Sequence, residues 1–204
     1  MIILDNFINE FSRLFPNLEK LQPWDVTSNL TGILNDLMLQ LDDNYEIING
    51  VAIHKTAKIE SGVILKAPAI ICENSFVGSH TYIRGGVYIA KSSSIGPTCE
   101  IKTSLIFCNS SIAHFNFIGD SIIGNNVNFE AGSLTANHYN ERVNKVISVM
   151  DDSVIINTGV NKFGSLVGDN SKIGANAVLS PGTVLMPGTI VKRLELIEQI
   201  KNNL

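Results

Sequence analysis

The chain has 204 residues and a formal net charge of −4, and 45% of its residues are hydrophobic. This length fits one domain with room for a small appendage. The mildly acidic balance gives no reason to expect nucleic acid or an anionic membrane surface as a partner. No apolar run is long enough to cross a bilayer, so we expect no membrane span.

The three cysteines, Cys72, Cys99 and Cys108, indicate a reducing environment. Three cysteines cannot all pair within one chain, and none lies in a Cys-x-x-Cys spacing. A cytoplasmic protein with free thiols is therefore the simpler interpretation.

Residues 1–50 predict a helical segment. Apolar residues recur at helical spacing over 5–15 and again over 28–41, and each run begins with a candidate capping residue. Two short helices cannot form a core of their own, so we expect the segment to pack on a larger unit. Its predicted role is that of a structural appendage or an oligomer contact.

From residue 53 onward the sequence follows a period of six residues. The first position of each hexad is aliphatic, and a small or β-branched residue follows four positions later. The first positions are Ile53, Ile59, Leu65, Ile71, Val77, Ile83, Ile89, Ile95 and Ile101. After an interruption, the pattern returns with Val167, Ile173, Leu179, Leu185 and Val191. Six is not a helical period, and the hexads carry Gly, Asn and Pro, so this is not an α-helix.

A short strand and a corner every six residues close a triangle after three strands. The next coil then stacks on the last at the normal inter-strand spacing of about 4.8 Å. Gly and Asn supply corner conformations with positive φ. The pattern therefore predicts a mainly β fold, a left-handed parallel β-helix over 51–191, whose hand is an exception to the usual crossover rule.

Two segments depart from the repeat. Residues 137–152 are polar and carry no hexad, so we expect them to leave the β-helix as a loop. Residues 192–204 have Leu194, Ile197 and Ile200 at helical spacing. They predict a C-terminal helix that caps the open end of the β-helix.

The interrupted region gathers a histidine, several asparagines and small residues. Its sequence, His114-x-x-Phe-Ile-Gly-Asp-Ser-x-Ile-Gly-x-Asn-Val-Asn-x-x-Ala-Gly-Ser-x-x-x-Asn137, resembles the acetyltransferase half of the bifunctional UDP-N-acetylglucosamine pyrophosphorylase/glucosamine-1-phosphate N-acetyltransferases. The later run NTGVNKFGSLVGDN, over 157–170, is similar to the archaeal branch of these enzymes. The resemblance covers about 53–191, without the pyrophosphorylase half.

The resemblance implies an acetyltransferase that uses acetyl-CoA, with His114 as its general base. An amine attacks a thioester only as the free base, and imidazole is suited to remove its proton. The backbone amide of Ala131 falls on the group that stabilises the oxyanion. Thr158 and Lys162 are candidate contacts of coenzyme A. A hydrogen-bonded surface histidine and a solvated loop are the structural alternatives.

The resemblance also implies a sugar-phosphate pocket. Arg84 and Lys102 fall on residues that hold the phosphate, which needs fixed cations. Asn128 and Asn137 fall on residues that bind the amino sugar, and Lys145 lies near a further substrate lysine, in a loop longer than the family's. The two cations could instead be solvated corner residues, and the two asparagines could be corner residues or an internal ladder.

Two positions depart from the family's pattern. Phe117 replaces a tyrosine three residues after the base, and His138 replaces another tyrosine after the second asparagine. Both changes remove a hydroxyl from the expected sugar pocket, so the acceptor could differ. In trimeric β-helices of this kind the groove lies between two subunits, so the resemblance implies a homotrimer.

Other functions stay open. The chain could be a non-catalytic sugar-nucleotide-binding or assembly module, or an acyltransferase with another donor or acceptor, for example an O-acetyltransferase. A hexapeptide-repeat carbonic anhydrase would need two histidines five residues apart, but Gly119 stands five residues after His114. Cysteine catalysis fits poorly, because Cys99 occupies a buried position and Cys72 and Cys108 have no evident base nearby.

Overall fold

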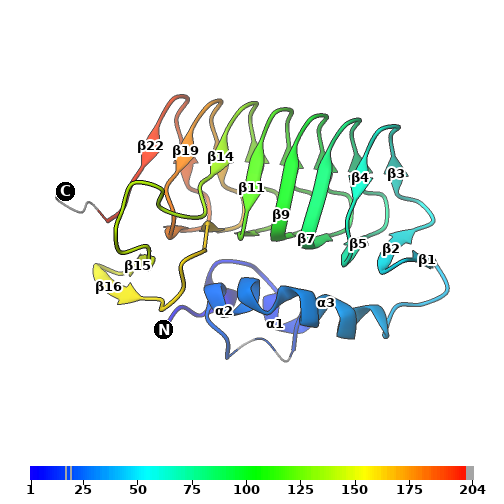
Figure 1. The fold of residues 1–204 in the computed structure, drawn as a ribbon, viewed down its shortest axis with the longest axis horizontal. Helices are drawn as coiled ribbons and strands as arrows, with labels where there is room; N and C mark the ends of the chain where they lie inside the picture. Colours follow the sequence, from blue (N-terminus) through cyan, green and yellow to red (C-terminus); the bar gives the residue numbers. More distant parts are fainter. Residues whose placement is uncertain (17, 19, 201–204) are drawn as a thin grey trace.

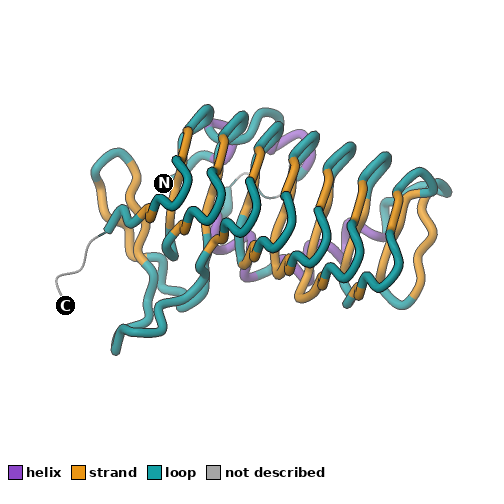
Figure 2. Tube along the Cα trace, turned by 90° about the horizontal axis from the view of Figure 1, so that it is seen from above, coloured by secondary structure: helices purple, strands orange, loops and turns teal. Residues whose placement is uncertain are grey.

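The chain forms a parallel β-helix with a helical N-terminal segment along one side (Figure 1). The structure is a computed structural model that describes residues 1–16, 18 and 20–200. Seen from above, the coils form a regular series (Figure 2). The predicted hexapeptide-repeat β-helix is confirmed, and its left-handed sense stays a prediction.

Each coil contributes a strand to each of three faces. The first face contains β2 (Val51–His54), β5 (Ala69–Ile71), β12 (Ile122–Ile123), β17 (Ser165–Val167) and β20 (Thr183–Leu185). The second face contains β3 (Lys58–Ile59), β6 (Phe76–Val77), β8 (Ser94–Ile95), β10 (Ser111–Ile112), β13 (Asn128–Phe129), β18 (Lys172–Ile173) and β21 (Ile190–Val191). The third face contains β4 (Ile64–Leu65), β11 (Phe117–Gly119), β14 (Leu134–Thr135), β19 (Val178–Leu179) and β22 (Leu196–Ile197).

Two long strands, β7 (Tyr82–Ile89) and β9 (Glu100–Ile106), turn the corner between the third and first faces. Their first halves pair with β4 and β11 on the third face, and their second halves pair with β5 and β12 on the first. The register between them shifts between Arg84 and Val87. This bulge places polar residues at the edge between the two faces.

The interior follows from the hexad. Aliphatic first-position residues such as Ile83, Ile95 and Ile101 are fully buried in one cluster that runs along the coil. The second position is small because it lies beside a corner. The hydroxyl of Ser75 donates to the carbonyl of Ala90 at 3.0 Å, one coil further on. Such bonds satisfy corner carbonyls that the strands leave unpaired.

The N-terminal segment covers the outer side of the first face. It contains η1 (Leu4–Asn6), α1 (Phe11–Leu14), α2 (Pro23–Ser28) and α3 (Leu30–Met38). Its apolar residues share a second core cluster with outward residues of the first face, including Leu105, Ile122 and Leu166. The first face is therefore apolar on both sides, which is typical of a sheet that is packed against other parts of the protein on both of its faces.

The first predicted helix is broken into η1 and α1. Glu10 has φ 62°, a left-handed conformation that no helix interior accepts. The carbonyl of Phe7 instead accepts a hydrogen bond from the amide of Asp169 at 2.8 Å. The second predicted helix is present as α3. Residues 45–48, expected to be part of the helical segment, form strand β1 (Tyr45–Ile48), which pairs antiparallel with β2 across an Asn-Gly turn.

The predicted C-terminal helix is wrong over 192–200. The chain there forms a further corner and β22, which pairs with β19. Leu194 occupies the corner with φ 62°, and Ile197 stands six residues after Val191, so the hexad continues. The spacing of three between apolar residues matched a helix by coincidence. The rest of that prediction, 201–204, lies outside the described residues.

The predicted loop at 137–152 is part of a longer excursion that rejoins the β-helix at β17. It carries an antiparallel hairpin of β15 (Ser148–Asp151) and β16 (Val154–Asn157). Figure 1 shows this hairpin projecting at the same end as the C-terminus. In the described part of the chain, no helix has the length and apolar character to cross a membrane.

Candidate functional site

A cavity of about 300 Å³ lies at the edge between the third and first faces. Its walls are formed by Arg84, Lys102, Phe117, Asn137, His138 and Lys162. All six residues were singled out from the sequence. Because they come from successive coils and from the excursion, the coil stacking brings together residues that are distant in sequence.

Arg84 and Lys102 are register partners on β7 and β9. Gly119 holds the same register position on the next coil. A Cβ atom at Gly119 would lie 2.6 Å from Cζ of Phe117 and 2.9 Å from Nδ2 of Asn137. The glycine therefore makes room for the ring and the amide that line the cavity, a requirement that the repeat pattern did not reveal.

Carboxylates hold both cations in place. Arg84 donates from Nε to Oε1 of Glu100 at 2.7 Å. Nζ of Lys102 lies 2.5 Å from Oδ2 of Asp120, and the two side chains are only 14% and 9% exposed. The Lys102–Asp120 pair is partly desolvated, whereas the Arg84–Glu100 pair is more exposed; in both pairs the carboxylate orients the cation before any anion binds.

Asp120 is the central polar residue of the site. Its Oδ2 accepts hydrogen bonds from both Lys102 and Nδ2 of Asn137. Its φ of 46° is a left-handed value that Asp tolerates better than most residues. Neither Asp120 nor Glu100 was assigned a role from the sequence. The sequence feature that points to Asp120 is its place directly after Gly119, with a candidate cation, Lys102, on the neighbouring coil.

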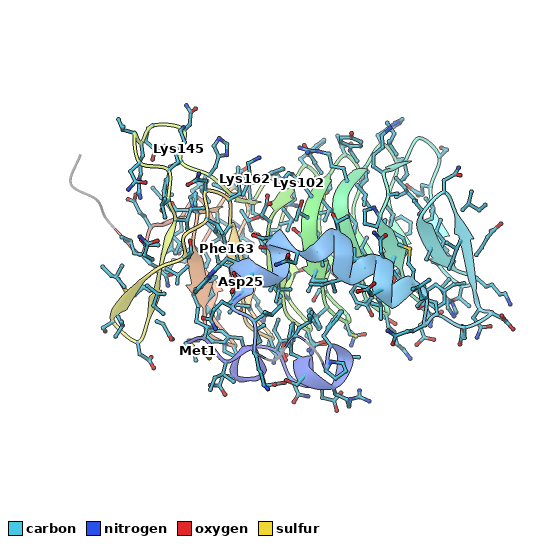
Figure 3. All side chains as sticks on the ribbon, turned by 60° about the horizontal axis from the view of Figure 1, so that its bottom comes forward. Met1, Asp25, Lys102, Lys145, Lys162 and Phe163 are labelled. Carbon is cyan, nitrogen blue, oxygen red and sulfur yellow. The ribbon has the colours of Figure 1, made fainter. Side chains whose placement is uncertain are left out.

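Lys162 lies beside Lys102 (Figure 3). Within the described residues no carboxylate pairs with it. The adjacent Phe163 is fully buried, packs edge-on against Trp24 with ring centroids 6.1 Å apart, and donates its amide to the carbonyl of Asn137. The sequence suggested coenzyme A as the partner of Lys162, but the cavity groups this lysine with the candidate phosphate ligands.

Lys145 does not reach the cavity. Its Nζ donates to the backbone carbonyls of Tyr139 and Asn140 at 3.0 and 3.3 Å, and it lies apart from Lys102 and Lys162 in Figure 3. Thr158 is likewise occupied, since its hydroxyl donates to the carbonyl of Ile147 at 2.6 Å. Both residues stabilise the excursion in this structure.

The predicted catalytic residues lie at the other edge of the third face. His114 is exposed at the corner between β10 and β11, and its ring contacts Phe115 edge-on at 5.2 Å. Ala131 is at the equivalent corner of the next coil, where the amide of Gly132 donates to the carbonyl of His114. No described residue accepts a hydrogen bond from the Ala131 amide. The structure therefore divides the predicted site into two groups.

A second groove, of about 480 Å³, lies on the second face near the end of the β-helix. It includes Asn128, which is exposed on β13, and two lysines, Lys172 and Lys192. Arg193 binds Glu130 through two nitrogens at 2.8 and 2.6 Å, and this hydrogen bonding lowers the pKa of the Glu130 carboxyl. The two lysines could hold phosphate groups of a nucleotide. The repeat pattern gave no reason to single them out.

Metal-dependent catalysis and cysteine catalysis have less support in this structure. Among the residues described, no group of three histidine, cysteine or acidic side chains is placed to hold a metal ion. Burial raises the pKa of Cys72, Cys99 and Cys108, which lowers the thiolate fraction at neutral pH.

Known proteins that are similar to this chain include two bifunctional proteins. The chain is 32% identical over 163 residues to the bifunctional protein GlmU of Methanococcus vannielii. It is 30% identical over 153 residues to a bifunctional sugar-1-phosphate nucleotidylyltransferase/acetyltransferase of Sulfurisphaera tokodaii. These matches cover 74% and 72% of this chain. They confirm the resemblance to the acetyltransferase half of such proteins.

The chain spans only 37% of the length of these two relatives. No protein-family model matches it. Among solved structures, a hexapeptide transferase family protein from Anaplasma phagocytophilum aligns over 72% of this chain and 74% of its own, with a TM-score of 0.37 and 21% identity. At that TM-score, no conclusion about this chain is drawn from the structural similarity. The β-helix and the two curated relatives show that the chain belongs to the same family as the acetyltransferase half of these bifunctional proteins.

Proposed function

We propose that the chain is an acetyl-CoA-dependent N-acetyltransferase that acts on an amino-sugar 1-phosphate. The main observation that supports this proposal is that Arg84, Lys102 and Lys162 line one cavity together with Asn137. Three cations and an amide suit a phosphorylated sugar, because fixed cations bind the phosphate and the amide orients a hydroxyl. The kinship with bifunctional acetyltransferases supports the same reaction.

We assign His114 and Ala131 to the acyl-transfer step, as the resemblance implies. As the substrate amine forms a bond with the thioester carbonyl carbon, His114 accepts the amine proton. The Ala131 amide donates to the oxyanion of the tetrahedral intermediate. The carbon–sulfur bond then breaks, and the proton passes to the departing thiolate. Lys172 and Lys192, in the second groove, are candidate partners of the nucleotide phosphates of coenzyme A.

A homotrimer in the cytoplasm is part of the proposal. His114 and Ala131 lie at one edge of the third face, and the phosphate cavity lies at the other. In a cyclic trimer with heterologous contacts, unlike edges of neighbouring subunits meet. The base of one subunit would then complete the phosphate cavity of the next.

A non-catalytic binding module is the second candidate. Phe117 and His138 both line the cavity in place of the family's tyrosines, and His114 is not among the cavity residues. These observations are compatible with a pocket that retains ligand binding without turnover.

Thiol release from acetyl-CoA, with a panel of amino-sugar 1-phosphates, tests the proposal. We expect turnover on one acceptor, and we expect the His114→Ala variant to lose about 100-fold or more of it, the usual contribution of a general base. His80→Asn, at an exposed corner with positive φ, is the matched control. Undiminished turnover in His114→Ala would refute the mechanism. Absence of release with every acceptor would favour an enzyme with a different acceptor if acetyl-CoA binds, and would favour the binding module if acetyl-CoA does not bind.

A further inference from the structure

A chain of hydrogen bonds crosses the cavity wall and ends at His138. Lys102 donates to Oδ2 of Asp120, Nδ2 of Asn137 donates to the same oxygen, and Oδ1 of Asn137 lies 3.2 Å from Nδ1 of His138. His138 is exposed and lines the cavity. The histidine is thus the outermost member of a buried polar network.

The donors and acceptors of this network fix the histidine's tautomer. A carboxylate only accepts, so Asn137 must present its NH₂ group to Asp120 and its oxygen to His138. An amide oxygen also only accepts, so Nδ1 of His138 carries the proton. The remaining nitrogen, Nε2, therefore has a free lone pair when the ring is neutral.

The charges around His138 leave the cavity with one uncompensated positive charge. Glu100 neutralises Arg84, and Asp120 neutralises Lys102, whereas no described carboxylate pairs with Lys162. A phosphate monoester dianion has two negative charges, one more than this positive charge can neutralise. A protonated His138 would balance it.

Two other charged groups on the excursion, Lys145 and Arg142, are already engaged. Lys145 binds backbone carbonyls, and Arg142 lies 3.2 Å from the Tyr139 ring centroid and 3.7 Å from carboxylate oxygens of Glu141 and Glu198. They are committed to structural contacts on the loop. His138 is thus the cavity-lining residue whose Nε2 remains available to accept a proton.

We infer that His138 takes up a proton when the cavity binds a phosphate monoester dianion. The inference rests on the proposed function only in that the ligand is a phosphorylated sugar. Because the bound dianion stabilises the imidazolium, affinity rises as pH falls. The His138→Gln substitution would leave the cavity one charge short and abolish this dependence.

Calorimetric titration with glucose 1-phosphate tests the inference, because this ligand has no amine to titrate. At about pH 7.5, in two buffers of different ionisation enthalpy, the buffer dependence of the heat counts the protons taken up. We expect wild type to take up a proton fraction that is absent from His138→Gln. Wild type should also bind about three- to tenfold more tightly one pH unit lower, in a ratio the variant does not show.

His80→Asn keeps the cavity and removes an imidazole elsewhere, so it should behave as wild type. Protons exchanged by the phosphate itself appear equally in all three proteins. Equal proton uptake in wild type and His138→Gln would overturn the inference, and so would absence of glucose 1-phosphate binding to wild type. Nitrogen-15 NMR of the histidine rings should also show the Nδ1–H tautomer for His138, and the Nε2–H tautomer would contradict the network.

The two proposals fail separately. Proton-coupled binding without acetyl transfer would refute the proposed reaction and support this inference. Acetyl transfer with no proton uptake at His138 would support the proposed reaction and refute this inference.

Discussion

At the scale of single residues, the site depends on Asp120. One buried carboxylate oxygen holds both the lysine and the asparagine of the cavity. Removing its charge would leave Lys102 without a partner in a partly desolvated position, which is more costly than losing an exposed ion pair.

We therefore expect Asp120→Asn to raise the KM for the sugar phosphate about tenfold or more and to lower the free energy of unfolding by about 2–4 kcal/mol. Asparagine tolerates the positive φ of this position, so the effect is electrostatic. Steady-state kinetics and urea unfolding measure the two effects. Asp152→Asn, in the exposed hairpin turn, is the control. Wild-type values for both would show that Asp120 does not organise the cavity.

The thiols give a second prediction at this scale. Burial raises the pKa of Cys72, Cys99 and Cys108. At neutral pH the folded protein should therefore react with a disulfide reagent at least about tenfold more slowly than the protein in urea. The protonated thiols favour the folded state below their unfolded pKa, and this contribution is lost as pH rises through the folded values. Equal labelling rates in buffer and in urea would contradict the burial.

At the scale of elements, the N-terminal segment supports the site through the excursion. Trp24 of α2 packs against Phe163, and Phe163 precedes β17 and follows Lys162. The helical segment thus fixes the position of a cavity lysine that no β-helix strand carries.

Trp24→Ala should lower the free energy of unfolding by about 3–5 kcal/mol, as for other large buried aromatic residues. It should also raise the KM for the sugar phosphate more than it lowers kcat, because Lys162 loses its support while His114 is unaffected. Trp24→Phe should restore most of the KM. If Trp24→Ala changed stability alone, the segment would have only a structural role.

A second contact fastens the same segment to the β-helix. The Asp169 carboxylate accepts hydrogen bonds from the amides of Asn9 at 2.9 Å and Asn125 at 2.6 Å. Asp169→Ala leaves these two amides without their acceptor, so we expect a loss of about 1–3 kcal/mol in urea unfolding. A loss no larger than that of Asp43→Ala, at an exposed position without a positive φ, would show that this contact is dispensable.

At the scale of the whole molecule, the β-helix could be predicted because its signal is repeated. Arg84 and Lys102 are 18 residues apart, three hexads, so their meeting on adjacent coils followed from the period. The hexad also continues from Val191 to Ile197, where a helical spacing of apolar residues competes with it, so the prediction of a helix there is wrong. The apolar outer residues of the first face, such as Ile70 and Leu166, could have revealed its covering segment.

The rest of the site could not be predicted, because it depends on a segment outside the repeat. The path of the excursion is set by tertiary packing of Phe163 and Tyr139, so Lys162 and Lys145 could not be told apart by spacing. The roles of Asp120 and Glu100 likewise depend on side-chain contacts between coils.

In the proposed assembly, the two groups of site residues at the two edges of the third face meet between neighbouring subunits. Co-expression of His114→Ala with Lys102→Ala, each nearly inactive alone, tests it through thiol release by the mixed oligomers. If each site takes the base from one subunit and the cations from the next, random mixing gives about a quarter of the sites both intact groups. Activity near that fraction of wild type is the predicted result. Mixed oligomers no more active than the parent variants would contradict a site shared between subunits.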